Sequence, residues 1–195
     1  MSENETLEAM SKFFGKYTLY DFEQQEQVMA LFSEWLIFEY RNNKNQRLID
    51  LYYLKDPDSL PENQSKELKQ IIETERYDFL EIDEIKKGEH FTAYGIYSGK
   101  EYKIYDKMGS SSLPEIGTLP GRIAKINKKW HLVGTDTFVI PMTYTNRAKK
   151  MLKLKDSQEK ISCKQILEYY LPKDIEKTKF SAKEIKNKRK KLISK

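Results

Sequence analysis

The stretch from residue 77 to residue 142 most constrains what this chain can fold into. It contains short runs of alternating apolar and polar residues, such as YDFLEIDEI, GEHFTAYGIY and KEYKIYDK. Alternation with a period of two is typical of β-strands that have one buried face. Turn residues separate the runs, among them Gly88 and the pair Ser98-Gly99, which suits a tight hairpin. We therefore expect about five or six short strands here.

Short strands joined by small turns favour a compact antiparallel barrel or a strongly curved sheet. The expected number of strands fits an SH3-like or an OB-like barrel, and the pattern does not distinguish these two topologies. A longer connection from residue 108 to residue 121, rich in Gly, Ser and Pro, interrupts the series. We interpret its segment Gly109-Ser110-Ser111-Ser112 as a flexible connector, because it lacks the GK[ST] ending of a phosphate-binding P-loop.

Helical periodicity surrounds the strands on both sides. Residues 1–76 predict an acidic cluster of helices, the strongest of them over 21–41, where apolar residues recur every three or four positions. Residues 143–172 predict two further helices, at 146–155 and 162–171, and residues 173–195 form a basic tail that is either a marginal helix or disordered. The expected fold class is α+β, with Phe32, Trp35 and Trp130 joining the helices to the barrel.

The charge is distributed unevenly along the 195 residues. Residues 1–87 hold 11 Lys and Arg against 19 Asp and Glu, whereas residues 88–172 hold 14 against 8 and the last 23 residues hold 10 against 3. Such asymmetry indicates an acidic partner or a polyanion. No apolar run approaches the length of a membrane span, and the polar, acidic N-terminal residues do not fit a secretory signal. We therefore expect a cytoplasmic protein without a membrane partner.

Candidate catalytic and metal-binding residues are few. Cys163 is the single cysteine and lies on an apolar helical face, and His90 and His131 lack the further ligands that a zinc site needs. The carboxylates Asp83, Glu84, Asp106 and Asp136 are dispersed and would form an acid–base pair only if the fold brought them together. We expect no catalytic residues, no metal and no cofactor.

Basic and aromatic residues interleave along the predicted strands. Small barrels bind single-stranded nucleic acid through a basic groove and aromatic side chains on which bases stack. The candidate residues are Tyr94, Tyr97, Lys100, Lys103, Tyr105, Arg122, Lys125, Lys128 and Lys129, with Lys188, Arg189, Lys190 and Lys191 of the tail. The competing interpretation is structural, since strand tyrosines often pack in a core and lysines protect edge strands from aggregation. The directions of Tyr94, Tyr97, Tyr102 and Tyr105 decide between the two.

The order of these elements resembles a domain of uncharacterised bacterial proteins, some of which also carry a cysteine-rich SEC-C zinc motif. The resemblance covers roughly residues 22–140. The residues that carry it are Trp35, Phe38, Gly88, Gly99, Tyr102, Asp106, Arg122, Trp130 and Gly134. It implies no zinc here, because Cys163 stands alone, and it implies no particular activity.

From the sequence we therefore expect a non-enzymatic binding or regulatory module whose partner is unknown. The alternative is a nucleic-acid-binding barrel assisted by the basic tail.

Overall fold

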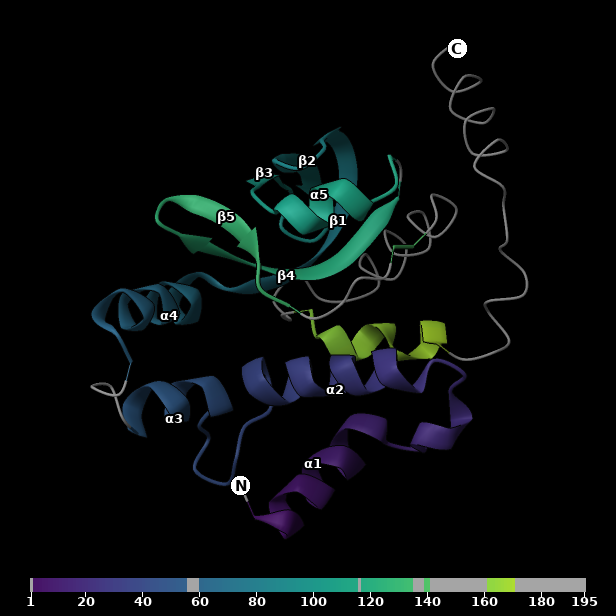
Figure 1. The fold of residues 1–195 in the computed structure, drawn as a ribbon. Helices are drawn as coiled ribbons and strands as arrows, with labels where there is room; N and C mark the ends of the chain where they lie inside the picture. Colours follow the sequence, from purple (N-terminus) through teal and green to yellow (C-terminus); the bar gives the residue numbers. More distant parts are fainter. Residues whose placement is uncertain (1, 56–59, 116, 135–138, 141–160, 171–195) are drawn as a thin grey trace.

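A small β-barrel sits on a layer of helices in this protein (Figure 1). The computed structural model describes residues 2–55, 60–115, 117–134, 139–140 and 161–170. The helix expected at 146–155 and the basic tail with Lys188, Arg189, Lys190 and Lys191 lie outside the described residues. Within the described part, helices combined with a closed five-stranded barrel confirm the α+β class.

The helical layer precedes the barrel in the sequence. Its elements are α1 (Glu3–Phe14), η1 (Leu19–Asp21), α2 (Gln25–Phe38), α3 (Leu48–Lys55) and α4 (Glu62–Thr74). Helix α1 begins at a capping box, in which the Ser2 hydroxyl accepts from the Glu5 amide and the Glu5 carboxylate accepts from the Ser2 amide at 2.7 Å. It ends at Gly15, whose φ of 62° few other residues adopt easily.

The barrel consists of β1 (Arg76–Lys86), β2 (His90–Gly95), β3 (Lys100–Ile104), β4 (Thr118–Ile126) and β5 (Lys129–Leu132). The strands close in the order β1-β2-β3-β5-β4, so that β4 pairs back with β1. The expectation of an all-antiparallel sheet is wrong at one place, because β3 and β5 run parallel. A parallel pair arises there because the chain crosses the barrel between β3 and β4 instead of turning back in a hairpin.

That crossing contains the short helix α5 (Lys107–Ser112), where we expected a flexible connector. Asp106 caps α5, since its carboxylate accepts a hydrogen bond from the Gly109 amide at 2.6 Å. The serine-rich sequence therefore forms a turn of helix and not a phosphate-binding loop.

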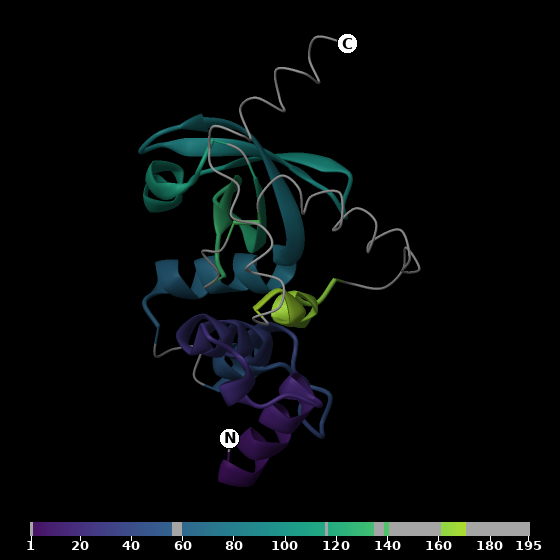
Figure 2. The ribbon, with the colours of Figure 1, turned by 90° about the vertical axis from the view of Figure 1, so that its right-hand side faces the viewer.

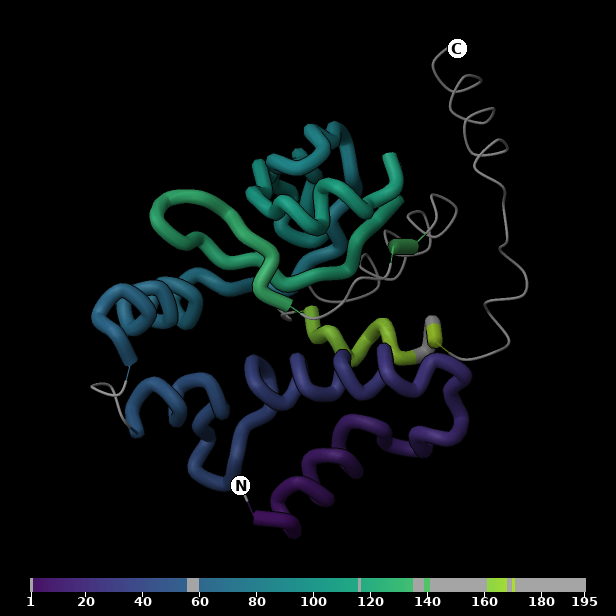
Figure 3. The backbone as a smooth tube through the Cα atoms, viewed as in Figure 1, coloured from purple at the N-terminus to yellow at the C-terminus, as the bar shows by residue number. Residues whose placement is uncertain are grey.

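A 3₁₀ helix, η2 (Cys163–Tyr170), lies along α2 on the side that faces the barrel (Figures 1 and 2). It occupies most of the range 162–171 that the sequence predicts as a helix. The tube drawing in Figure 3 shows η2 between α2 and the barrel, with α1 on the opposite side of α2. In the described part of the chain, no helix combines the length and apolar character needed to cross a membrane.

Two hydrophobic clusters result. The first joins α1, α2 and η2 to the outward side of β1, through residues such as Phe13, Leu31, Ile166 and Phe79. The second fills the barrel with side chains such as Leu80, Phe91 and Ile123. Phe32 and Trp35 belong to the first cluster, whereas Trp130 packs against the second. Phe32 and Trp35 therefore lie in the cluster that joins the helices to β1, as expected, whereas the expectation is wrong for Trp130, which packs against the barrel core.

Candidate nucleic-acid interface

The outer surface of β2 and β3 has an acidic end around Tyr94 and a basic end around Tyr105. The basic end also holds the carboxylate of Glu89, whose Oε2 lies 3.9 Å from Nδ1 of His90 and 2.8 Å from Nζ of Lys86. The strand register places Tyr94 between Glu81 of β1 and Glu101 of β3. Tyr94 is 43% exposed. Its aromatic ring is therefore accessible, but two carboxylates flank it. A phosphate group at that end would meet negative charge, so Tyr94 is poorly placed to bind nucleic acid.

The basic end is centred on Tyr105, which directly follows β3. His90 of β2 and His131 of β5 flank it, with ring centroids 5.6 Å and 6.4 Å from the Tyr105 centroid. The Nζ atoms of Lys129 and Lys103 lie 4.7 Å and 5.6 Å from that centroid. We call these five side chains the Tyr105 surface.

Strand alternation explains why three strands contribute to the Tyr105 surface. On β5, Trp130 and Leu132 pack against the barrel core, so Lys129 and His131 point outward. On β3, Tyr102 and Ile104 are buried, which turns Lys103 outward. The backbone carbonyl of Trp130 accepts a hydrogen bond from the Tyr105 amide at 2.8 Å, and this bond holds the end of β3 beside β5.

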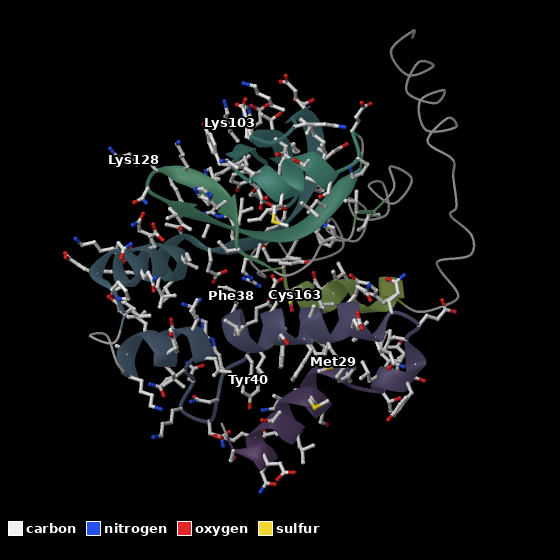
Figure 4. All side chains as sticks on the ribbon, viewed as in Figure 1. Met29, Phe38, Tyr40, Lys103, Lys128 and Cys163 are labelled. Atoms are coloured by element: carbon white, nitrogen blue, oxygen red, sulfur yellow. The ribbon has the colours of Figure 1, made fainter. Side chains whose placement is uncertain are left out.

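Lys125 and Lys128 are exposed beside the turn between β4 and β5. The turn is fixed by Asn127 and Lys128, which both adopt positive φ, and by a hydrogen bond from the Asn127 amide to Gln70 of α4 at 2.6 Å. Figure 4 labels Lys128 on this hairpin and Lys103 on the barrel. Both lysines are accessible, and Lys128 adjoins Lys129 of the Tyr105 surface.

Arg122 belongs to the interior and not to the surface where the sequence pattern suggested it. Its side chain is 3% exposed. Its three guanidinium nitrogens donate separately to Glu34 of α2, to Glu39 just after α2 and to Glu75 between α4 and β1. A guanidinium enclosed by three carboxylates cannot also bind a phosphate.

The electrostatics of this cluster affect two groups. Burial alone would lower the pKa of Arg122, but the three carboxylates outweigh burial and raise that pKa above its usual value. Cys163 lies beside the cluster, where its amide donates to Glu39 at 2.9 Å. Burial and the neighbouring carboxylates raise the pKa of the Cys163 thiol well above its usual value.

Tyr97 and Lys100 lie apart from the Tyr105 surface, at the hairpin between β2 and β3. Buried Asp78 shapes this hairpin, because its carboxylate accepts hydrogen bonds from the amides of Tyr97 at 2.9 Å and Ser98 at 3.1 Å. Tyr97 packs against the first hydrophobic cluster. Tyr97 and Lys100 both line a pocket between the barrel and the helices. Tyr102 is buried at 3% exposure.

The fold thus separates the residues that the sequence grouped. Lys103, Tyr105 and Lys129 meet on one surface, Tyr97 and Lys100 line a pocket, and Arg122 is buried. Sequence reasoning left out His90 and His131 from the nucleic-acid candidates. The signal that could have included them is their position, since strand alternation places His131 on the same face as Lys129.

No protein-family model, no curated protein and no solved structure matches this chain. The resemblance to the domain that accompanies SEC-C motifs is untested by these comparisons and stays a prediction.

Proposed function

We propose that this protein is a non-enzymatic, cytoplasmic binding module whose barrel is of the OB type and whose ligand is single-stranded nucleic acid. The order β1-β2-β3-β5-β4 with a helix between β3 and β4 supports the OB assignment over the SH3-like alternative. Barrels of this type bind oligonucleotides on the face of their second and third strands. The proposal narrows the unknown partner expected from the sequence to one class of ligand.

The observation that carries the proposal is the position of Tyr105 on that face, with two lysines beside it. Single-strand binding combines aromatic rings that stack on bases with cations that follow the phosphates. Tyr105, His90 and His131 offer three neighbouring rings, and exposed Lys103 and Lys129 supply the cations.

Binding of a base to Tyr105 requires the Lys129 side chain to move. In the free protein the Lys129 ammonium lies over the Tyr105 ring at 4.7 Å, where it makes a cation–π contact. A base that stacks on this ring displaces the ammonium, which can then reach the phosphate of the same nucleotide. The exchange costs little because the lysine is exposed and its four-carbon stem is flexible.

The test measures binding of the full chain to a fluorescently labelled oligothymidine strand and to a labelled duplex at low salt. We expect the single strand to bind more tightly and Tyr105→Ala to weaken it by about tenfold, which corresponds to one lost stacking contact. Tyr94→Ala is the matched control, because Tyr94 is a more exposed strand tyrosine on the acidic end.

Deletion of residues 173–195 separates the barrel from the basic tail. If the barrel binds, the shortened chain retains the effect of Tyr105→Ala. Binding that disappears with the tail alone, or equal losses in Tyr105→Ala and Tyr94→Ala, would refute the proposal.

A further inference from the structure

A pocket of about 660 Å³ opens between the helical layer and the barrel, away from the Tyr105 surface. The end of α2, the start of β1 and the hairpin between β2 and β3 form its walls. Figure 4 shows Phe38, one of the lining residues, at the end of α2 below the barrel. This volume lies within the range of pockets that hold small ligands.

Three acidic groups in the wall, those of Glu39, Glu75 and Asp78, are already neutralised or hydrogen-bonded, whereas Glu73 is exposed and pairs with Lys69 at 4.0 Å. Glu75 pairs with Arg47 at 2.8 Å through one oxygen and with Arg122 through the other, and Glu39 also pairs with Arg122. The Asp78 carboxylate accepts backbone amides of the hairpin. These carboxylates therefore have little capacity left to attract a cation.

Arg47 and Arg122 in the wall are paired with carboxylates, but two other cationic groups, those of Arg76 and Lys100, are less fully occupied. Within the described residues, Lys100 and Arg76 make no ion pair, and the Nε atom of Arg76 is buried without a hydrogen-bond acceptor. The Arg76 guanidinium lies over the Trp130 ring at 5.2 Å, a contact that leaves its N–H groups free to donate. A buried donor without a partner is costly, and an acceptor from a ligand would remove that cost.

We propose that this pocket binds a small molecule that carries an oxyanion, either a phosphate or a carboxylate group, and that Arg76 and Lys100 hold the oxyanion. The half-buried rings of Phe38 and Tyr97 contribute apolar wall against the remainder of the ligand. This site is separate from the proposed nucleic-acid surface, since Lys100 and Lys103 lie at positions of opposite parity on β3.

Trp130 provides a direct readout because it contacts Arg76 and only one other tryptophan, Trp35, is present in the chain. Tryptophan fluorescence of the Trp35→Phe variant is followed during titration with three probes that carry no nucleobase, namely inorganic phosphate, ribose 5-phosphate and citrate. We expect saturable changes in Trp130 emission for at least one probe, and a comparison of the three shows whether phosphate or carboxylate is preferred. The same probe raises the melting temperature of the native chain, because a ligand that binds only the folded state stabilises it.

Lys100→Ala is the decisive variant, since Lys100 is exposed and we expect its replacement to leave the fold intact. It is expected to weaken probe binding by at least about tenfold, the usual effect of losing a charged hydrogen bond. Arg76→Gln is expected to do the same, and its melting temperature without ligand verifies that it folds. Lys103→Ala, a lysine on the same strand, is the matched control and leaves probe binding unchanged.

Oligonucleotide binding by the same variants keeps the two proposals distinguishable. We expect Lys103→Ala to weaken binding of the oligonucleotide and to leave binding of the small probe unchanged. We expect Lys100→Ala to weaken binding of the small probe and to leave binding of the oligonucleotide unchanged. Absence of a response to all three probes, or probe binding that is unaffected by both Lys100→Ala and Arg76→Gln, would overturn the pocket proposal, whatever the oligonucleotide does.

Discussion

Arg122 of β4 and Glu34 of α2 form a buried ion pair between residues 88 positions apart in the sequence, with Nε and Oε1 separated by 3.0 Å. The two side chains are 3% and 0% exposed. Glu39 and Glu75 complete the enclosure of the guanidinium. This single residue therefore connects the barrel to α2, to the segment after α2 and to the end of α4.

Replacing Arg122 tests how much this connection contributes. In Arg122→Met, three carboxylates lose their common cation while they remain largely buried, and breaking one side of a buried ion pair typically costs about 3–5 kcal/mol. We expect a decrease of that size in the free energy of unfolding, measured by urea denaturation. Lys125→Met on the same strand is the control and should change stability by less than about 0.5 kcal/mol, because Lys125 is exposed. Equal effects of the two variants would contradict the role of Arg122.

Gly95 at the end of β2 is predicted to tolerate no side chain. A Cβ atom there would lie 2.4 Å from both the Asp78 carboxylate and the Ser98 hydroxyl, and 2.8 Å from the Tyr102 ring. We expect Gly95→Ala to destabilise the protein by about 1–3 kcal/mol, since it overpacks a buried hairpin.

Thermal denaturation measures this effect, with Gly121→Ala as the control. A Cβ atom at Gly121 would meet its nearest neighbour at 3.6 Å, an ordinary contact distance. A melting temperature of Gly95→Ala equal to that of Gly121→Ala would contradict this prediction, because it would mean that the hairpin accommodates the added methyl group without loss of stability.

Cys163 is predicted to be unreactive in the folded protein. Its thiol is fully buried, its pKa is raised by burial and by nearby carboxylates, and only the thiolate reacts with disulfide reagents. Ellman's reagent should therefore modify it at neutral pH only after the protein unfolds in denaturant.

The sign of the pH effect follows from the direction of this shift. A thiol whose pKa is higher in the folded state than in the unfolded state contributes stability below the unfolded pKa, which is ordinarily about 8.5. That contribution decreases as the pH rises above this value. Cys163→Ala should therefore lose less stability than the native chain over the same alkaline range. Rapid modification of the native protein at neutral pH would disprove the buried position.

The salt dependence of oligonucleotide binding reports the phosphate contacts of the Tyr105 surface. Each phosphate neutralised on a single strand contributes about 0.7 to the slope of log K against log salt concentration. Replacing both Lys103 and Lys129 with alanine should decrease the magnitude of this slope by about 1.4.

Tyr105→Ala should leave the slope unchanged, because stacking releases no counterions. The matched control is replacement of the exposed residues Lys44 and Lys87, which lie outside the Tyr105 surface. A slope that decreases equally with this control pair would mean that any surface lysine contributes, and that the Tyr105 surface is not the binding site.

Local signals in the sequence were sufficient to predict most of the secondary structure. The helical stripe in residues 21–41 corresponds to α2, and the pair Ser98-Gly99 lies in the hairpin between β2 and β3. These features depend on hydrophobic periodicity and on the backbone preferences of glycine, which are properties of a few neighbouring residues. The small barrel followed from them. The parallel pairing of β3 with β5 did not, because it depends on how the chain crosses the barrel.

The sequence likewise predicted some properties of the candidate site and not others. The sequence by itself determined that lysines and tyrosines alternate along the strands, and alternation assigned each of them to one of two strand faces. Only the tertiary structure decided what covers each face. Tyr105 lies on a face that stays open and brings His90 and His131 together from strands far apart in sequence. Arg122 lies on a face that the helical layer covers. Its ion-pair partners Glu75, Glu39 and Glu34 precede it in the chain by 47, 83 and 88 positions. Contacts at such separations arise from packing between elements, which no local pattern of residues records.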